Sequence, residues 1–364
     1  MVTQTISLYL KKKHHVYYLA RTSDPSAAVV PSNCFYFPSK DLKASIRYYN
    51  QLLAELKIDV VINQGPFLPF NPIIFNPARD KTVRAFSFLH FMPGFEFERI
   101  KYVWMTEKKP LKRFFKQLKT TLGLNTLQYH PDKTRKKYRD LYHVCDRTVV
   151  LSPAYIDLFQ AAYRLPESGK LTAIPNPSRC RCDSADILTR KKRVVLFAGR
   201  LELESKRVDR LLSIWKSIDC KEGWELKIVG DGPHREALER MVENEDITHV
   251  SFLGQRNDME SFYKEAAIIA LTSTYEGLAL CFIEAIQYGA VPISFDVSAG
   301  LRDILADISP DILIEPFAME KYAECLQRLM SNDTYRDSIA RKALEKGREY
   351  TLDSIGRQWD KLLE

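Results

Sequence analysis

Four charged residues in the second half of the chain have types and spacings that suit a phosphorylated, hydroxyl-rich ligand. Glu276 and Glu284 are eight positions apart. If both lay on one helix, they would be separated by roughly 12 Å, too far to act on one bond but suitable for the two ends of a long ligand. Arg200 and Lys206 follow Gly199, which ends the apolar run VVLFA. Arginine grips phosphate oxygens in pairs and lysine acts as a point charge, so this pair suits a diphosphate.

The backbone beside these side chains could also bind an anion. A glycine at a strand end, Gly199, lets the chain turn and a ligand approach closely. A predicted helix starts after Glu276, and the free N–H groups at its N-terminus form an anion site. Helix capping, surface solvation and plain cations at a helix start are the alternatives for all of these residues. The expected backbone donors are Gly277, Leu278, Ala279 and Leu280.

The surrounding sequence predicts two α/β domains. From about Lys191 onward, apolar runs alternate with amphipathic helical patterns, which is typical of a parallel sheet covered on both faces. The first half repeats the pattern less regularly. At 364 residues, two domains are the natural expectation. We therefore predict two Rossmann-like domains facing each other across a cleft, with ligands beyond the carboxyl ends of the strands. The first-half strands are predicted at 16–20, 34–37, 58–63, 82–89 and 147–151.

Composition shifts give the domain boundaries. Pro175, Asn176 and Pro177 interrupt the pattern, so we place the N-terminal domain at 1–175 and a C-terminal domain, with the candidate site residues of the second half, at 176–349. Residues 350–364 are predicted to form a terminal helix, and the resemblance of the second half to a known family implies that this helix packs back on the N-terminal domain. Through Pro175, 27 Lys and Arg stand against 13 Asp and Glu, whereas the remainder has 27 against 33. The basic first half should therefore face something anionic.

Several motifs occur in an order that resembles a known family. STYEGLALCFIEAIQYGAVPISFD is similar to the E-x7-E signature of the family 4, or group 1, retaining glycosyltransferases, which have the GT-B architecture. FAGRLELESKRVDRLL resembles the same family's GRL and KG-x-x-LL element, and VGDGP, SFLG and IPNP recur with the expected spacing. The resemblance covers about residues 145–364, with fainter support back to residue 5.

The resemblance implies a role for each matching residue. Arg200 and Lys206 match the pair that binds the donor diphosphate and stabilises it as it leaves. Glu284 matches the glutamate that holds the nucleotide ribose, and Glu276 the one that contacts the donor sugar. His90, in FSFLHFMPG, resembles an N-domain histidine near the transferred sugar, although a histidine at a strand end is often structural. The implied reaction retains the anomeric configuration and needs no metal.

Three departures from the family pattern stand out. Arg207 occupies a position where the family usually has glycine, and Ser298-Ala299-Gly300-Leu301 replaces a Gly-Pro or Pro-Ser loop. The chain also begins with a predicted helix, Thr5 to Lys13, followed directly by the strand VYYLA. The first strand of the N-terminal domain and its glycine-rich loop are therefore expected to be missing, which would expose apolar surface and unpaired backbone. We interpret Met1 as an internal methionine of a longer protein.

A basic insertion at 101–140 carries 12 Lys and Arg against 3 acids. A basic amphipathic helix within it would bind an anionic membrane surface, or pack on its own domain as an ordinary helix. No nucleic-acid-binding motif accompanies it. We expect reduced cysteines, Cys180 and Cys182 included, and a cytoplasmic protein on the inner face of the membrane. The apolar positions of this helix are Leu111, Phe114, Phe115, Leu118 and Leu122.

The predicted function is the transfer of a sugar from a nucleoside diphosphate, with uridine as the expected base, to a glycan or lipid-linked acceptor in the synthesis of cell-surface polysaccharide such as lipopolysaccharide or capsule. The alternative is a truncated nucleotide-sugar-binding protein with impaired catalysis. A sugar-nucleotide epimerase fits the E-x7-E context less well. The missing G-x-G-x-x-G after the first strand of either half argues against a dehydrogenase.

Overall fold

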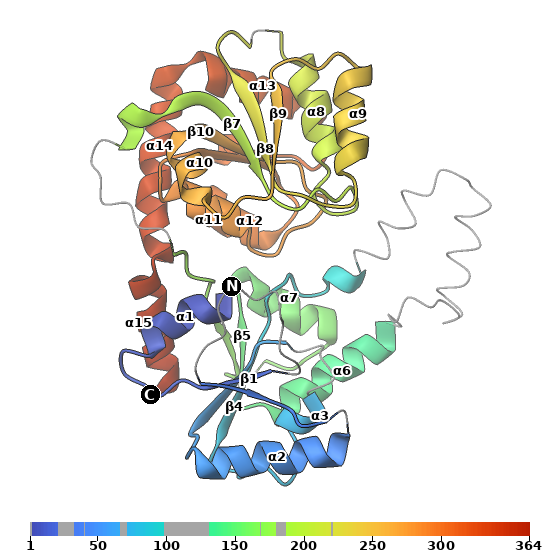
Figure 1. Cartoon of the computed structure of the whole chain (residues 1–364), viewed down its shortest axis with the longest axis vertical. Coiled ribbons are helices and arrows are strands. Elements are labelled where there is room, and N and C mark those ends of the chain that lie inside the picture. The colour runs from blue at the N-terminus through green and yellow to red at the C-terminus, as the bar shows by residue number, and fades with distance from the viewer. Residues whose placement is uncertain are drawn as a thin grey trace, which may run out of the picture. The chain divides into compact units, whose positions relative to one another are not determined.

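The computed structural model describes residues 2–20, 33–39, 41–65, 71–97, 131–167, 169–179, 187–219 and 221–364. The predicted basic helix and both cysteines of the SRCRCDS stretch lie outside these ranges. The chain divides into two compact units, one made of residues 1–6 and 175–362 and the other of residues 7–174 and 363–364 (Figure 1). We call them the C-terminal unit and the N-terminal unit and describe each by itself.

A six-stranded parallel sheet in the order β12-β11-β10-β7-β8-β9 forms the centre of the C-terminal unit. Its central strands are buried along most of their length, as their continuous apolar sequences predict. The strands are β7 (Lys192–Ala198), β8 (Glu225–Val229), β9 (Val250–Gly254), β10 (Ala266–Leu271), β11 (Val291–Phe295) and β12 (Leu313–Ile314).

Two groups of helices cover this sheet. α8 packs against α9 and α13, whereas α11 packs against α10 and α14 (Figure 1). The doubly wound arrangement predicted from the sequence is thereby confirmed. The helices are α8 (Val208–Ser217), α9 (Arg235–Asn244), α10 (Met259–Glu265), α11 (Leu280–Ile286), α12 (Ala299–Leu305), α13 (Met319–Ser331), α14 (Asp333–Gly347) and, at the end of the chain, α15 (Leu352–Leu363).

The N-terminal unit contains a four-stranded parallel sheet in the order β3-β4-β5-β6 and a separate two-stranded sheet, β1-β2. β1 and β3 therefore belong to different sheets. The strands are β1 (Tyr18–Ala20), β2 (Cys34–Tyr36), β3 (Val60–Asn63), β4 (Arg84–Phe88), β5 (Arg147–Val150) and β6 (Leu171–Ala173). The helices of this unit are α2 (Leu42–Glu55), α3 (Asn71–Ile74), α6 (Pro131–Val144) and α7 (Ala154–Tyr163). α1 (Val2–Leu10) has its first residues in the C-terminal unit and its last ones in this unit.

A buried carboxyl group joins α6 and α7 to the segment after β4. Glu96 is 1% exposed and accepts a hydrogen bond of 2.8 Å from the Tyr138 hydroxyl, and the Tyr163 hydroxyl lies 3.3 Å from its other oxygen. Burial raises the pKa of Glu96 above its ordinary value, against the hydrogen bonds, which lower it. The two tyrosine rings stack on each other with centroids 3.8 Å apart.

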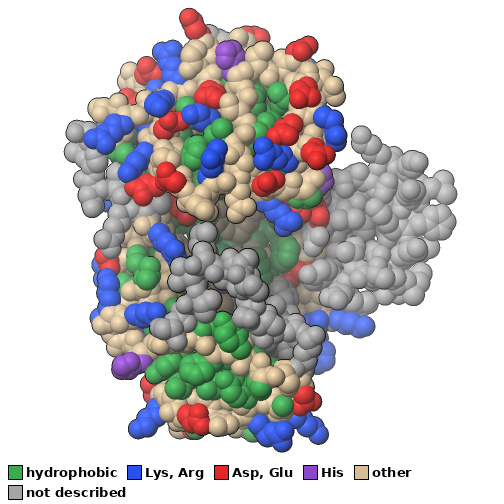
Figure 2. Space-filling view, viewed as in Figure 1, with side chains coloured by type: hydrophobic (Ala, Val, Ile, Leu, Met, Phe, Trp, Pro, Cys, Tyr) green, Lys and Arg blue, Asp and Glu red, His purple; other side chains and the backbone are tan. Residues whose placement is uncertain are grey.

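The surfaces of the two units differ in character. Figure 2 shows acidic and basic side chains mixed over the visible face of the C-terminal unit, and hydrophobic side chains gathered on part of the N-terminal unit. Near α2, partly buried hydrophobic residues pack on a small core of Tyr49, Leu53, Ile73 and Val83. Within the described ranges, every helix is too short or too polar to cross a lipid bilayer.

Candidate functional site

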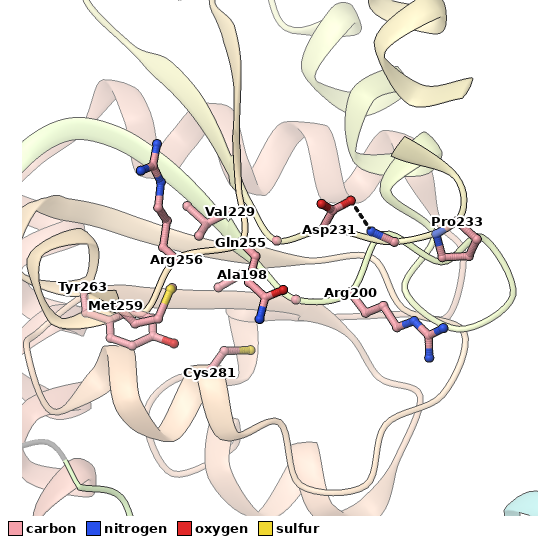
Figure 3. A pocket seen from close by; sticks show the side chains of 13 residues that line it. Ala198, Arg200, Val229, Asp231, Pro233, Gln255, Arg256, Met259, Tyr263 and Cys281 are labelled. Carbon is pink, nitrogen blue, oxygen red and sulfur yellow. Dashed lines mark hydrogen bonds between the residues drawn. The ribbon is translucent and has the colours of Figure 1, made fainter. Parts of the chain in front are cut away.

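A pocket of about 750 Å³ lies at the carboxyl ends of β7, β8 and β9, where parallel sheets bind ligands. The loop after β7 contributes Gly199 and Arg200, and α11 contributes Cys281. Figure 3 shows Arg200 on one side of the pocket and Tyr263 with Met259 on the other. The remaining lining residues are Ala198, Val229, Gly230, Asp231, Gly232, Pro233, Gln255 and Arg256.

Glycine is required where the loops after β7 and β8 meet. Gly230 has a φ of +143°, and a Cβ atom there would lie 1.8 Å from the carbonyl oxygen of Gly199. A Cβ on Gly232 would lie 2.5 Å from the carbonyl oxygen of Leu201. The backbone N–H of Leu201 also donates to the Asp231 carbonyl, at 2.9 Å. The VGDGP motif thus places the backbone of the β7 loop against that of the β8 loop.

A second contact holds the β7 loop against the loop after β10. The backbone N–H of Thr274 donates to the Ser205 carbonyl at 2.7 Å, and the Thr272 hydroxyl donates to the Arg207 carbonyl at 2.8 Å. These bonds bring the chain around Lys206 next to the chain around Glu276, which is 70 positions away in sequence. Three strand ends therefore determine the positions of the candidate site residues together.

Lys206 and Glu276 form a largely buried ion pair. Lys206 Nζ lies 2.7 Å from Glu276 Oε1, with side chains 23% and 7% exposed, and the Ser273 hydroxyl donates to the same oxygen at 2.5 Å. Burial acts to lower the pKa of Lys206, but the charge of Glu276 and the hydrogen bond to it outweigh this effect, so the pKa is raised. Lys206 is therefore a permanent cation. Its Cε atom would lie 3.8 Å from a Cβ on Gly199, which places it at the edge of the pocket.

Glu284 reaches the same pocket through a tyrosine. The Tyr263 hydroxyl donates to Glu284 Oε2 at 2.7 Å, and Tyr263 itself lines the pocket. Burial raises the pKa of Glu284 above its ordinary value, although the hydrogen bond from Tyr263 and the charge of Arg179 act to lower it. Burial also raises the pKa of the Cys281 thiol to about 12, so this thiol is protonated at neutral pH.

The predicted helix after Glu276 is shorter than expected. α11 begins at Leu280, so Gly277, Leu278 and Ala279 precede the helix, and the expectation that helix N–H groups begin at Gly277 is wrong. The Leu278 and Ala279 side chains are 7% and 4% exposed because this turn packs into the core. Glu276 therefore lies on a loop, and the helical rise between the two glutamates does not apply.

Of the predicted site residues, Gly199 and Arg200 line the pocket. Lys206 and Glu276 bind each other beside Gly199, and Glu284 is hydrogen-bonded to the lining residue Tyr263 without lining the pocket itself. Arg200 is exposed at its rim. His90 lies in the N-terminal unit directly after β4, with its Nε2 atom 2.6 Å from Gln64 Oε1. Sequence patterns gave no indication of Tyr263, because a tyrosine on an amphipathic helix looks like any core aromatic. Among the described residues, no three His, Cys, Asp or Glu side chains group as a metal site would.

The departure at Arg207 has a backbone explanation. Arg207 has φ and ψ of 49°, the left-handed conformation that favours glycine. Its guanidinium binds the Asp209 carboxylate through Nε at 2.9 Å and through a second nitrogen at 2.7 Å. The backbone at this position is thus one that glycine adopts without strain, and the ion pair with Asp209 offsets part of the strain that arginine has there.

Comparisons with known proteins agree with this architecture. Residues 184–346 match the family model described as glycosyl transferases group 1. The amylovoran biosynthesis glycosyltransferase AmsD of Erwinia amylovora is 31% identical over 179 residues, which are 49% of this chain and 50% of that protein. The lipopolysaccharide 1,6-galactosyltransferase of Salmonella typhimurium is 27% identical over 188 residues, 50% of this chain and 49% of that protein. The match therefore spans about half the length of each relative.

Solved structures resemble a larger part of the chain. The sucrose-phosphate synthase of Thermosynechococcus elongatus superposes with a TM-score of 0.74 at 16% identity, over 100% of this chain and 91% of that one. Anabaena HepE in complex with UDP and glucose superposes with a TM-score of 0.65 at 14% identity, over 91% and 85%. The fold is GT-B, with two Rossmann-like domains. Residues 184–346 are thus similar to the group 1 glycosyltransferases, the family that the motifs of the second half resemble.

Proposed function

We propose that this chain is a retaining glycosyltransferase that moves a hexose from a uridine diphosphate sugar to a hydroxyl of a cell-surface glycan or its lipid-linked precursor. The observation that carries the proposal is a set of two cations and two carboxylates at and next to the pocket. Arg200 lines it, and Lys206 binds Glu276 beside it. Glu284 is hydrogen-bonded to the lining residue Tyr263. A nucleoside diphosphate sugar carries groups that suit these charges: a ribose diol for one carboxylate, two phosphates for the cations, and sugar hydroxyls for the other carboxylate.

Each charge suits one part of such a donor. Arg200 at the rim can hold phosphate oxygens in a bidentate manner, and Lys206 supplies a fixed positive charge beside Gly199. Both stabilise the negative charge that develops on the leaving diphosphate. Glu276 is oriented by Lys206 and Ser273 and can accept hydrogen bonds from sugar hydroxyls. Glu284 can accept them from the ribose.

In the proposed reaction the acceptor oxygen forms a bond to the anomeric carbon while the bond from that carbon to the diphosphate oxygen breaks. Attack occurs on the face from which the diphosphate leaves, so the configuration is retained, and a donor phosphate oxygen takes the acceptor proton. The cations Arg200 and Lys206 supply the electrostatic stabilisation, so the proposal includes no metal. His90 is proposed to contact the transferred sugar from the N-terminal unit.

The names of the similar proteins support the choice of donor and acceptor. The Anabaena structure is a complex with UDP and glucose, and the Salmonella relative transfers galactose in lipopolysaccharide. Uridine as the base and a cell-surface glycan as the acceptor are therefore part of the proposal. The proposed location is the cytoplasmic side of a membrane, and its motivation is the basic sequence at 101–140.

Ligand-induced thermal stabilisation tests the donor site. The chain is melted with UDP, GDP, ADP and a panel of their sugars, and then again as Glu284→Ala and Arg200→Ala. A ligand at one hundred times its dissociation constant stabilises by about 2.7 kcal/mol, which is easily seen. Arg240→Ala and Glu236→Ala, with side chains 66% and 87% exposed, serve as controls.

We expect one uridine diphosphate sugar to raise the melting temperature of the wild type and of both controls. It should leave the melting temperatures of Glu284→Ala and Arg200→Ala unchanged. Transfer of its sugar to an extracted glycan, with NMR of the new linkage, then tests the retaining reaction. A folded wild-type protein that none of the nucleotides stabilises would refute the proposal. Stabilisation without transfer to any acceptor would favour a binding protein.

A further inference from the structure

The pocket wall formed by α10 contains a polar group that the proposed reaction does not use. Tyr263 is 2% exposed and lines the pocket, and its hydroxyl donates to Glu284 Oε2 at 2.7 Å. Figure 3 shows its ring beside Met259, on the side of the pocket away from Arg200. The phenol therefore lies at the end of the pocket opposite the proposed phosphate-binding cation.

The surroundings of Tyr263 hold its ring in one place. The ring stacks on Tyr288 with centroids 6.5 Å apart and an angle of 15° between the planes. The carbonyl oxygen of Tyr263 accepts a hydrogen bond of 2.8 Å from Lys191 Nζ, next to the start of β7. A phenol with only two side-chain torsions that is fixed at both ends is a rigid donor.

Glu284 needs such a donor because its own side chain is flexible. A glutamate side chain has three rotatable bonds, and fixing them costs conformational entropy when a ligand binds. A hydrogen bond to one carboxylate oxygen removes much of this freedom in advance and still lets the second oxygen accept from a ligand. Within the described ranges, Tyr263 is the hydrogen-bond donor that Glu284 has.

We propose that Tyr263 is a positioning residue for nucleotide binding: its hydroxyl orients the Glu284 carboxylate so that the carboxylate accepts hydrogen bonds from the ribose diol of the donor. The inference rests on the proposed function, in which Glu284 binds that ribose. It adds a specificity element, since a pocket built around an oriented acceptor discriminates against a nucleotide that lacks the diol.

Isothermal titration with two nucleotides tests this role. UDP and 2′,3′-dideoxyuridine diphosphate are titrated into the wild type, Tyr263→Phe, Glu284→Gln and the double variant. Tyr322→Phe is the matched control, because the buried Tyr322 hydroxyl also donates, to the Ile293 carbonyl at 2.9 Å, in the same unit. Thermal melting of every variant confirms that it is folded.

We expect the wild type to prefer UDP over the dideoxy nucleotide by about one hundred-fold, and Tyr263→Phe to reduce that preference about ten-fold, the order of one hydrogen bond to a charged group. Tyr322→Phe should keep the full preference. In the Glu284→Gln background, adding Tyr263→Phe should change the preference for UDP little further, because the two residues act as one unit.

Three other results would overturn the inference. If Tyr263→Phe weakened the binding of both nucleotides equally, the tyrosine would have a purely structural role. The same would follow if Tyr263→Phe reduced the preference for UDP as much in the Glu284→Gln variant as in the wild type. A wild type that binds both nucleotides equally would show that Glu284 does not hold the ribose, while leaving the diphosphate site in place. A wild type that binds neither would refute the proposed function itself.

Discussion

Replacing Gly230 by alanine should disrupt the floor of the pocket. The new Cβ would lie 1.8 Å from the Gly199 carbonyl oxygen, a backbone atom that cannot swing aside, so the loops after β7 and β8 must separate by more than about 1 Å. Such overpacking costs about 1–3 kcal/mol, and a non-glycine residue at a φ of +143° costs a further 1–3 kcal/mol or so.

The expected loss for Gly230→Ala is therefore about 3 kcal/mol or more. For a unit of this size, it corresponds to a fall of roughly 6–12 °C in the melting temperature. Affinity for UDP should fall as well, because the displaced loop carries Gly199 and Arg200. Differential scanning calorimetry and titration with UDP measure the two effects.

Two other glycine substitutions provide the comparison, one next to the pocket and one in the N-terminal unit. A Cβ at Gly199 would meet a Phe197 ring atom at 3.5 Å, an ordinary contact, so Gly199→Ala should change stability by less than about 0.5 kcal/mol and yet weaken UDP binding by placing a methyl group in the pocket lining. Gly169→Ala has nothing within 4 Å and should change neither property. If Gly230→Ala melted like the wild type, the reasoning about the loop contact would be wrong.

Three further predictions concern charges and strain. Arg207→Gly should be more stable than Arg207→Ala by about 1 kcal/mol in urea denaturation, since alanine keeps the left-handed strain and only glycine relieves it; equal stability would contradict this. Lys206→Met should destabilise the ligand-free protein by about 3 kcal/mol in urea denaturation, because it leaves the largely buried Glu276 without its cation; an unchanged free energy of unfolding would count against it. Glu96 binds its proton more tightly when folded, so its contribution to stability falls as pH rises from the ordinary glutamate pKa through the raised one. Glu96→Gln should remove that slope above the ordinary glutamate pKa; an unchanged slope in urea denaturation would disprove it.

The strands and the site differ in how far the sequence could predict them. β7, β10 and β11 were predictable because a strand buried on both faces is a short continuous apolar run. The start of α11 was not, because the turn before it, from Gly277 to Ala279, is as apolar as the helix. The start of α11 is therefore set by the packing of Leu278 into the core and is not marked by any local signal in the sequence.

The same limit applies to the pocket. Arg200, Lys206 and the two glutamates were candidates because charged residues next to apolar strands are conspicuous. Tyr263 was not, since its role depends on a hydroxyl that meets Glu284 only after β10 and α11 have folded. The contact of Gly230 with Gly199 is also invisible in the sequence, where 31 positions separate them, although the VGDGP motif marks its position.

Every residue that lines the pocket belongs to the C-terminal unit, and so does the segment that matches the family model. Substitutions in the N-terminal unit therefore leave the pocket lining unchanged. A gene with this arrangement can change the half that encodes the N-terminal unit without altering the pocket that the other half forms.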